Sequence, residues 1–131
     1  MAGIAIAGNP NAGKTSLFNH LTGAAQSVGN YPGVTVERKE GVARLNGRRV
    51  SVVDLPGTYS LTAYSQEELV ARNFIIEDGP DLVVDVLDAS NLERHLYLAI
   101  QIMEMGAPLL LALNMVDVAK RRGLDIDHAK L

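Results

Sequence analysis

Residues 8–15 read Gly-Asn-Pro-Asn-Ala-Gly-Lys-Thr, and this stretch decides the fold. An apolar run, residues 4–7, precedes it and fits a buried strand, while residues 16–21 follow it as the first turns of a helix. A strand, a glycine loop and a helix in this order are the setting in which such an octapeptide is a P-loop. Two glycines let backbone N–H groups converge on phosphate oxygens, and the helix N-terminus adds its dipole. The alternative is an ordinary glycine turn, which the flanking strand and helix disfavour.

We therefore predict a phosphate site in which the Lys14 ammonium reaches the outer phosphates and the Thr15 hydroxyl holds magnesium. Because a P-loop binds only the phosphates, the identity of the base must come from residues elsewhere in the chain. The predicted phosphate site consists of Gly8, Asn9, Pro10, Asn11, Ala12, Gly13, Lys14, Thr15 and Ser16.

The composition is that of one soluble globular domain over residues 1–131. Hydrophobic residues make up 47% and charged residues 21%, and the longest apolar run, Ala107 to Leu113, is too short to span a bilayer. The chain has no cysteine, which excludes disulfides and thiolate metal sites and fits the cytosol. A net charge of −3 gives no electrostatic reason to expect a nucleic acid as the main partner.

Apolar strand segments alternate with amphipathic helical segments, which predicts an α/β sheet covered by helices. Residues 23–34 lack any periodicity and are predicted to form a loop. Residues 35–45 and 48–54 are predicted to form a hairpin, because the Asn46-Gly47 pair between them is typical of a type I′ turn. One antiparallel pair should therefore lie at the edge of an otherwise parallel sheet. The remaining predicted elements are a helix over 67–77, a strand over 82–87, a helix over 91–105 and a strand over 109–113.

A second motif, Asp54-Leu55-Pro56-Gly57, follows an apolar strand. Ligands of open α/β sheets bind beyond the carboxyl ends of the strands, so a carboxylate here can meet the magnesium directly or through water. The Gly57 N–H can approach a terminal phosphate. Taken alone, this pattern is more often a plain turn, but its place after a P-loop strengthens the functional interpretation.

A third motif, Asn114-Met115-Val116-Asp117, also follows an apolar strand directly. The Asp117 carboxylate can accept two hydrogen bonds from guanine, from N1–H and from the exocyclic amine, whereas adenine offers no matching pair. Asn114 would brace the base and the P-loop. A helix cap is the alternative and would be preferred if the segment stood alone. With two phosphate-side motifs upstream, guanine recognition is the better interpretation.

Taken together, the three motifs resemble those of the Ras-like, translation-factor-related GTPases, and more closely those of the N-terminal G domain of the FeoB ferrous iron transporters. The resemblance implies a three-layer P-loop fold with a mostly parallel sheet and one antiparallel edge strand. The family's last guanine-binding loop, with the final strand and helix, should lie beyond residue 131, so a truncated G domain is expected. The stretches that carry the resemblance are residues 8–19, residues 30–37 (Asn-Tyr-Pro-Gly-Val-Thr-Val-Glu), residues 54–61, residues 88–94 and residues 114–117.

The resemblance also implies roles for residues outside the motifs. Thr35 matches the threonine that binds magnesium when the γ-phosphate is present; its local alternative is a surface strand threonine. Asn11 matches the asparagine of potassium-activated members, whose side-chain oxygen helps to hold a monovalent cation. Backbone carbonyls around residues 29–31 would complete that cation site. Lys14, Thr35 and Gly57 are the expected catalytic residues.

Two residues depart from the common GTPase pattern. Thr58 stands where Ras-like proteins have a glutamine that orients the attacking water, so slow hydrolysis is expected. Met115 stands where many GTPases have lysine, and it can lie against the face of the base without adding charge. The three histidines, His20, His95 and His128, are spread along the chain, with the last two expected to be exposed, and no iron site is visible.

The sequence thus favours a domain that binds GTP or GDP with Mg²⁺ and K⁺ and slowly hydrolyses GTP. The resemblance places it on the cytoplasmic side of the inner membrane, joined to a helical regulatory domain and a membrane permease in a longer chain. Two alternatives remain open. One is a nucleotide-gated binding module with negligible catalysis, and the other is an Era-like ribosome-assembly GTPase.

Overall fold

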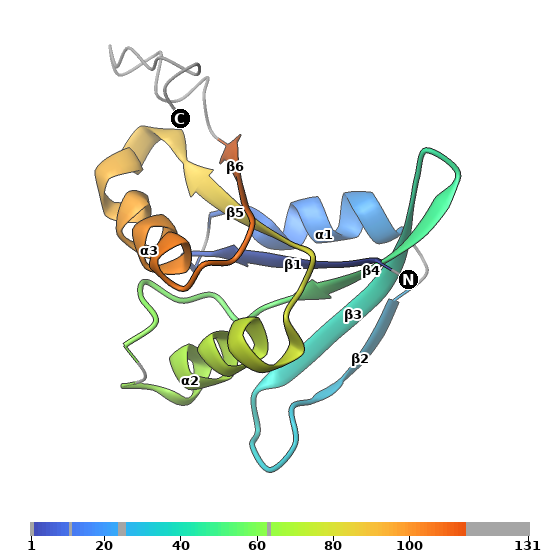
Figure 1. The fold of residues 1–131 in the computed structure, drawn as a ribbon, viewed down its shortest axis with the longest axis horizontal. Helices are drawn as coiled ribbons and strands as arrows, with labels where there is room; N and C mark the ends of the chain where they lie inside the picture. Colours follow the sequence, from blue (N-terminus) through green and yellow to red (C-terminus); the bar gives the residue numbers. More distant parts are fainter. Residues whose placement is uncertain (1, 11, 24–25, 63, 115–131) are drawn as a thin grey trace.

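The computed structural model describes residues 2–10, 12–23, 26–62 and 64–114, and these residues form one mixed sheet with helices on both faces (Figure 1). The sheet order is β2-β3-β4-β1-β5-β6. The strands are β1 (Ala2–Gly8), β2 (Gln26–Asn30), β3 (Glu37–Leu45), β4 (Arg48–Asp54), β5 (Leu82–Asp88) and β6 (Leu109–Asn114). The helices are α1 (Lys14–Thr22), α2 (Gln66–Asn73) and α3 (Leu92–Glu104), with a π-helical turn, η1 (Phe74–Asp78), after α2 and a 3-10 turn, η2 (Ala89–Asn91), before α3.

Two apolar clusters, one on each face of the sheet, make the structure three-layered. Phe18 of α1 packs with Ile6 of β1 and Val52 of β4 on one face. On the other face, Ala5 of β1 and Val53 of β4 pack with residues of the loop after β4, of α2, of η1 and of α3, namely Leu55, Leu61, Ala71, Ile75, Leu98 and Ile102. Neighbouring strand residues alternate between the two clusters, as the period of a strand requires. The three-layer α/β architecture predicted from the sequence is confirmed.

The predicted hairpin has the turn that its sequence favours. Asn46 and Gly47 adopt φ values of 54° and 77°, the positive angles that a type I′ turn needs. The turn sets the register of β3 on β4, from Leu45 opposite Arg48 back to Lys39 opposite Asp54. β3 is therefore antiparallel to β4, whereas β1, β4, β5 and β6 run parallel.

The prediction of a loop over residues 23–34 is wrong in part, because β2 lies within it. β2 pairs antiparallel with β3 and forms the edge of the sheet, so the described sheet has two antiparallel pairs instead of one. Every residue of β2 is exposed, and its one large apolar side chain, Val28, is 65% exposed. The backbone ladder holds this strand, and hydrophobic periodicity cannot reveal a strand that buries no side chain.

One helix boundary differs from the prediction and another agrees with it. The helix predicted over 67–77 continues as an α-helix only to Asn73 and then changes to the π-helical turn η1. The helix predicted over 91–105 begins as expected, because Asn91 is the N-cap residue of α3, although its side chain makes no capping hydrogen bond. Asp88 caps the 3-10 turn η2 in front of it: its carboxylate accepts a hydrogen bond from the Ser90 N–H at 2.9 Å. Asp88 closes β5, so a single residue ends the strand and begins the helical segment.

Candidate functional site

The predicted motifs meet at one edge of the sheet. β1 ends at Gly8, β4 at Asp54 and β6 at Asn114, and because these strands run parallel their carboxyl ends lie at the same edge. Ligands of open α/β sheets bind at this edge. The sheet topology therefore places Gly8, Asp54 and Asn114, which are far apart in the sequence, at one edge of the sheet.

The loop between β1 and α1 presents backbone donors. Gly13 precedes α1 with a φ of 94°, in the left-handed region that glycine adopts without strain. No side chain caps the helix there, so the N–H groups of its first turn point out of the helix end. An end of this kind attracts anions, because the helix dipole adds to the N–H donors.

Two cavities open in front of this loop. The first, which we call the helix cavity, has a volume of about 450 Å³ and is lined by Pro10, Gly13, Lys14, Thr15, Ser16 and Gly57. The second, the strand cavity, has a volume of about 290 Å³ and is lined by Lys14, Thr15, Thr35, Val36, Glu37, Lys39, Asp54, Leu55, Pro56 and Glu67. Lys14 and Thr15 line both, so the P-loop is the shared wall.

The strand cavity brings Thr35 to Thr15 and Asp54. Thr35 is an exposed residue of the loop that joins β2 to β3. Hydroxyl and carboxylate oxygens are the ligands that Mg²⁺ prefers, and these three residues line one cavity. The donor set therefore fits magnesium.

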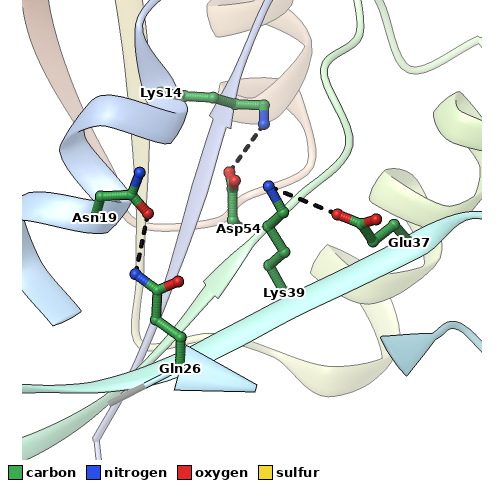
Figure 2. A network of polar contacts seen from close by, with 6 residues as sticks. All are labelled: Lys14, Asn19, Gln26, Glu37, Lys39 and Asp54. Carbon is green, nitrogen blue, oxygen red and sulfur yellow. Dashed lines mark hydrogen bonds and ion pairs between the residues drawn. The ribbon is translucent and has the colours of Figure 1, made fainter. Parts of the chain in front are cut away.

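Lys14 and Asp54 form an ion pair at the centre of the site (Figure 2). The Lys14 Nζ lies 2.9 Å from the Asp54 Oδ1, and the two side chains are only 13% and 3% exposed. Each side chain thereby neutralises the other in a poorly hydrated place, where an unpaired charge would be costly. To bind phosphate, Lys14 must exchange this carboxylate for phosphate oxygens.

Three further charged residues, Glu37, Lys39 and Glu67, line the strand cavity and escaped the sequence prediction. The Lys39 Nζ lies 3.6 Å from the Glu37 Oε1, and Lys39 is the cross-strand partner of Asp54. Figure 2 shows Lys39 beside Asp54, across from Lys14. The sequence did hold a signal for it, because counting back from the Asn46-Gly47 turn pairs Lys39 with Asp54.

Gly57 and Thr58 pack against the P-loop. A Cβ added at Gly57 would lie 3.1 Å from the Cα of Pro10, so only glycine fits this approach without displacing the backbone. The Thr58 N–H donates to the carbonyl oxygen of Gly8 at 3.0 Å, and Thr58 is 5% exposed. Thr58 is part of the packing below the loop and does not line either described cavity.

Some predicted site residues lie elsewhere. Gly8, at the end of β1, and Asn9 and Ala12, in the loop that follows, are buried and are absent from the lining of the two cavities described. The Asn9 amide is 1% exposed, and neither its oxygen nor its nitrogen has a hydrogen-bond partner among the described residues. Asn11, Met115 and Asp117 lie outside the described residues, and for Asn114 only the backbone, opposite Asp88, is described.

The segment predicted to complete a potassium site belongs to the β2–β3 ribbon. Gly29 and Asn30 pair with Arg38 and Glu37, and the Tyr31 carbonyl accepts a hydrogen bond from the Val34 N–H at 3.3 Å. The Tyr31 N–H donates to the Val36 carbonyl in the same register, so by the alternation of antiparallel pairs the Gly29 groups also face β3, whereas the Asn30 groups face away from it. The Gly29 and Tyr31 carbonyls therefore have partners within the ribbon.

His95 is buried, which corrects the expectation of an exposed histidine. It is 6% exposed, its Nδ1 accepts a hydrogen bond from the Asp88 N–H at 3.3 Å, and burial lowers its pKa. Within the described ranges, no group of three or more His, Cys, Asp or Glu side chains is placed to hold a metal ion. No helix within the described ranges has both the length and the apolar character needed to cross a membrane.

Comparisons with known proteins agree on one family. A family model described as ferrous iron transport protein B matches residues 2–131. The Fe(2+) transporter FeoB of Salmonella typhimurium is 53% identical over 128 residues, which is 95% of this chain and 17% of that protein. The chain thus spans about one sixth of this curated relative's length.

Solved structures show the same architecture. The G domain of the T. maritima FeoB iron transporter has a TM-score of 0.91 and 48% identity, over 99% of this chain and 79% of that one. A mutant of S. thermophilus NFeoB bound to GDP has a TM-score of 0.92 and 51% identity, over 99% of this chain and 51% of that one. The described sheet and helices therefore have the fold of a P-loop GTPase domain.

Proposed function

Because the chain belongs to the FeoB_N family, the N-terminal G domain of ferrous iron transport protein B, we propose that it binds GTP with Mg²⁺ and hydrolyses GTP slowly. The observation that carries this proposal is the strand cavity, whose lining joins the P-loop to Thr35 and Asp54. The GDP-bound relative supports a guanine nucleotide as the ligand. Hydrolysis yields GDP and phosphate.

The residues of the site have separate tasks in this proposal. Lys14 and the first-turn amides of α1 offset the charge that develops on the phosphate oxygens as the bond to the leaving diphosphate breaks. The Gly57 N–H holds the terminal phosphate from the side of the helix cavity. Mg²⁺, when bound, neutralises phosphate charge, and Thr15, Thr35 and Asp54 are the residues that would hold it.

Recognition of guanine falls to Asn114 and Asp117 in this proposal. β6 ends at Asn114, at the same sheet edge as the P-loop. The Asp117 carboxylate accepts the two donors of guanine, and Met115 lies against the face of the base.

The Asn11 side chain and carbonyls of residues 29–31 would hold a potassium ion, which would supply the charge that an arginine finger supplies in other GTPases. The switch role follows from the same contacts: loss of the γ-phosphate frees the loops around Thr35 and Gly57, which line adjoining cavities with the P-loop.

The potassium part of the proposal is tested by the salt dependence of hydrolysis. We expect GTP hydrolysis with Mg²⁺ to be about tenfold or more faster in K⁺ than in Na⁺ at equal ionic strength, less than the ~10³-fold or greater effect of an arginine finger. Asn11→Ala should abolish this difference, whereas Asn91→Ala, at an exposed asparagine on η2, should preserve it. Equal rates of the unaltered protein in the two salts would refute the potassium role.

The guanine assignment is tested by Asp117→Asn. Losing two hydrogen bonds to a charged acceptor should weaken GDP binding by about 10²-fold and improve binding of xanthosine diphosphate. Competition against a fluorescent nucleotide measures both affinities, with ADP as the reference that should compete poorly before and after the change. An Asp117→Asn protein that binds GDP as well as the unaltered protein would contradict guanine recognition by this residue.

One observation favours a second candidate, a nucleotide-gated binding module with negligible catalysis. Thr58 occupies the position of the water-orienting glutamine of Ras-like proteins, and its N–H is bonded to Gly8. Single-turnover hydrolysis of bound GTP, with and without K⁺, separates the candidates: nucleotide binding without turnover in either salt would favour the module.

The role in the whole protein is also a proposal, since the relative is a much longer Fe(2+) transporter. The domain acts as the cytoplasmic switch of an iron transporter, at the inner membrane, joined to a helical regulatory domain and a membrane permease. Its partners are then those domains and the nucleotide, and no nucleic acid is required.

A further inference from the structure

We propose that Arg38 is a positioning residue for the proposed reaction: it clamps Tyr31 against Phe74 and so holds residues 29–31 in the β2–β3 ribbon, outside the lining of the two described cavities. This inference rests on the proposed function, in which the carbonyls of residues 29–31 complete the cation site. GTP and the cation must then open the clamp before hydrolysis can proceed.

The clamp is a guanidinium between two aromatic rings. The Arg38 Cζ lies 5.4 Å from the centroid of the Tyr31 ring and 5.8 Å from that of the Phe74 ring. Both distances fall within the range of about 6 Å in which a cation is attracted by a ring face. Arg38 thereby joins the loop after β2 to the end of α2.

Burying the clamp leaves two polar groups without hydrogen bonds, and this desolvation cost opposes the attraction between Arg38 and the rings. Tyr31 is 7% exposed, and its hydroxyl and the Arg38 Nε are both buried without a hydrogen-bond partner among the described residues. An ion pair with Glu40, at 3.2 Å, is a polar contact that the structure gives the Arg38 head group. Burial also raises the pKa of Tyr31 to about 12, although Arg38 acts in the opposite direction. Opening the clamp would rehydrate the Tyr31 hydroxyl and the Arg38 Nε, so the desolvation cost of the closed state favours opening while the cation–π attraction favours closure.

The backbone groups of Tyr31 are hydrogen-bonded within the β2–β3 ribbon while the clamp is closed. The Tyr31 N–H donates to the Val36 carbonyl at 3.0 Å, and the Tyr31 carbonyl accepts from Val34 at 3.3 Å. Gly29 lies opposite Arg38 itself in the ladder. The Gly29 and Tyr31 carbonyls can therefore turn to a cation only if the ribbon opens, and Tyr31 must then leave Arg38.

The other end of the clamp lies where helical geometry changes. Phe74 begins the π-helical turn η1, directly after α2, and turns of this type often occur at functional sites. α2 itself follows the segment that contains Gly57, and in Figure 1 the loop between β2 and β3 projects on the same side of the sheet as α2. Opening the clamp would remove a contact from α2, so nucleotide state and the position of α2 become linked.

The first test measures the potassium requirement. Removing the two cation–π contacts should raise the fraction of open protein about tenfold, and the apparent cation affinity rises with that fraction. We expect Arg38→Ala to lower the K⁺ concentration for half-maximal GTP hydrolysis about tenfold, with GDP affinity unchanged. Arg38→Lys keeps the charge but loses the planar group, so its K⁺ concentration for half-maximal hydrolysis should lie between those of Arg38→Ala and the unaltered protein. A midpoint within twofold of the unaltered value would overturn the proposal.

Two controls isolate the clamp. Arg72→Ala removes an exposed arginine of α2, and Glu40→Gln removes the ion pair of Arg38 while leaving the rings; both should leave the potassium midpoint unchanged. A shift in Glu40→Gln as large as that in Arg38→Ala would assign the effect to the ion pair and refute the clamp.

A second test needs no nucleotide. The chain has no tryptophan, so Phe74→Trp creates a single reporter that keeps an aromatic face beside Arg38. In the nucleotide-free protein, adding Arg38→Ala should shift the tryptophan emission to longer wavelength, because Tyr31 and the guanidinium no longer cover the ring. An unchanged spectrum would refute the clamp whatever the ligand, whereas potassium-independent hydrolysis of the unaltered protein would refute the cation role in the proposed function.

Discussion

Replacing Lys14 with methionine is expected to reduce the rate of GTP hydrolysis by about 10²–10³-fold, the loss typical of removing one donor that stabilises transition-state charge. Methionine keeps the length of the side chain but no charge. Lys14 lines both cavities and is the only Lys or Arg among residues 8–16, so no other side chain of the P-loop can replace its charge at the outer phosphates. Single-turnover hydrolysis at saturating GTP and Mg²⁺ measures the effect.

The Lys14→Met variant also tests the ion pair. Asp54, with a side chain 3% exposed, would lose its partner at 2.9 Å, so the melting temperature should fall together with the rate. Lys14→Met combined with Asp54→Asn should recover stability but not hydrolysis. Arg72→Met, at an exposed site on α2, should change neither quantity. Hydrolysis within tenfold of the unaltered rate in folded Lys14→Met would contradict the role of Lys14.

Asp85→Asn is expected to stabilise the protein at pH 8 by up to about 4 kcal/mol, which corresponds to a melting temperature up to ~15 °C higher. Asp85 lies in β5 between Ala7 of β1 and Leu111 of β6, is fully buried, and has no hydrogen-bond partner within the described residues for either carboxyl oxygen. Burial raises its pKa to about 7, because the charged form is poorly hydrated there. An aspartate within the apolar run of residues 82–87 is unusual and would be expected to face solvent or a partner, but the structure buries it.

The sign of the pH effect follows from the raised pKa. Between pH ~4 and pH 7 the folded protein holds a proton on Asp85 that the unfolded chain has lost, so stability falls as the pH rises through this range. The amide introduced by Asp85→Asn does not titrate, so the stability difference between the variant and the unaltered protein should grow from near zero below pH 4 and level off above pH 7. Taking the difference removes the opposite contribution of buried His95, whose lowered pKa costs stability at acid pH.

Denaturant unfolding at several pH values measures this difference. Asp78→Asn, an exposed carboxylate at the end of η1, is the matched control and should show no comparable trend. A constant difference between Asp85→Asn and the unaltered protein from pH 4 to pH 8 would show that Asp85 does not titrate in this range.

Most of the fold could be predicted because its elements have strong local signals. The glycine loop, the Asn46-Gly47 turn and the apolar strands each depend on residues close together in the chain, and the structure confirms these elements. β2 escaped because an exposed edge strand held by backbone hydrogen bonds has no hydrophobic period. The buried positions of Asp85 and His95 escaped because a polar residue in an apolar segment does not reveal which elements cover it.

The sequence by itself determined the chemistry of the site: a P-loop with Lys14 and Thr15, a carboxylate at the end of a strand, and a segment suited to guanine. These are local patterns, since backbone conformation and ligand type follow from neighbouring residues. Only the tertiary structure decided which side chains contact the site residues. It placed Lys39 beside Asp54, bonded Lys14 to that carboxylate, and set Arg38 between Tyr31 and Phe74, because cross-strand register and helix packing bring together residues that no local pattern connects.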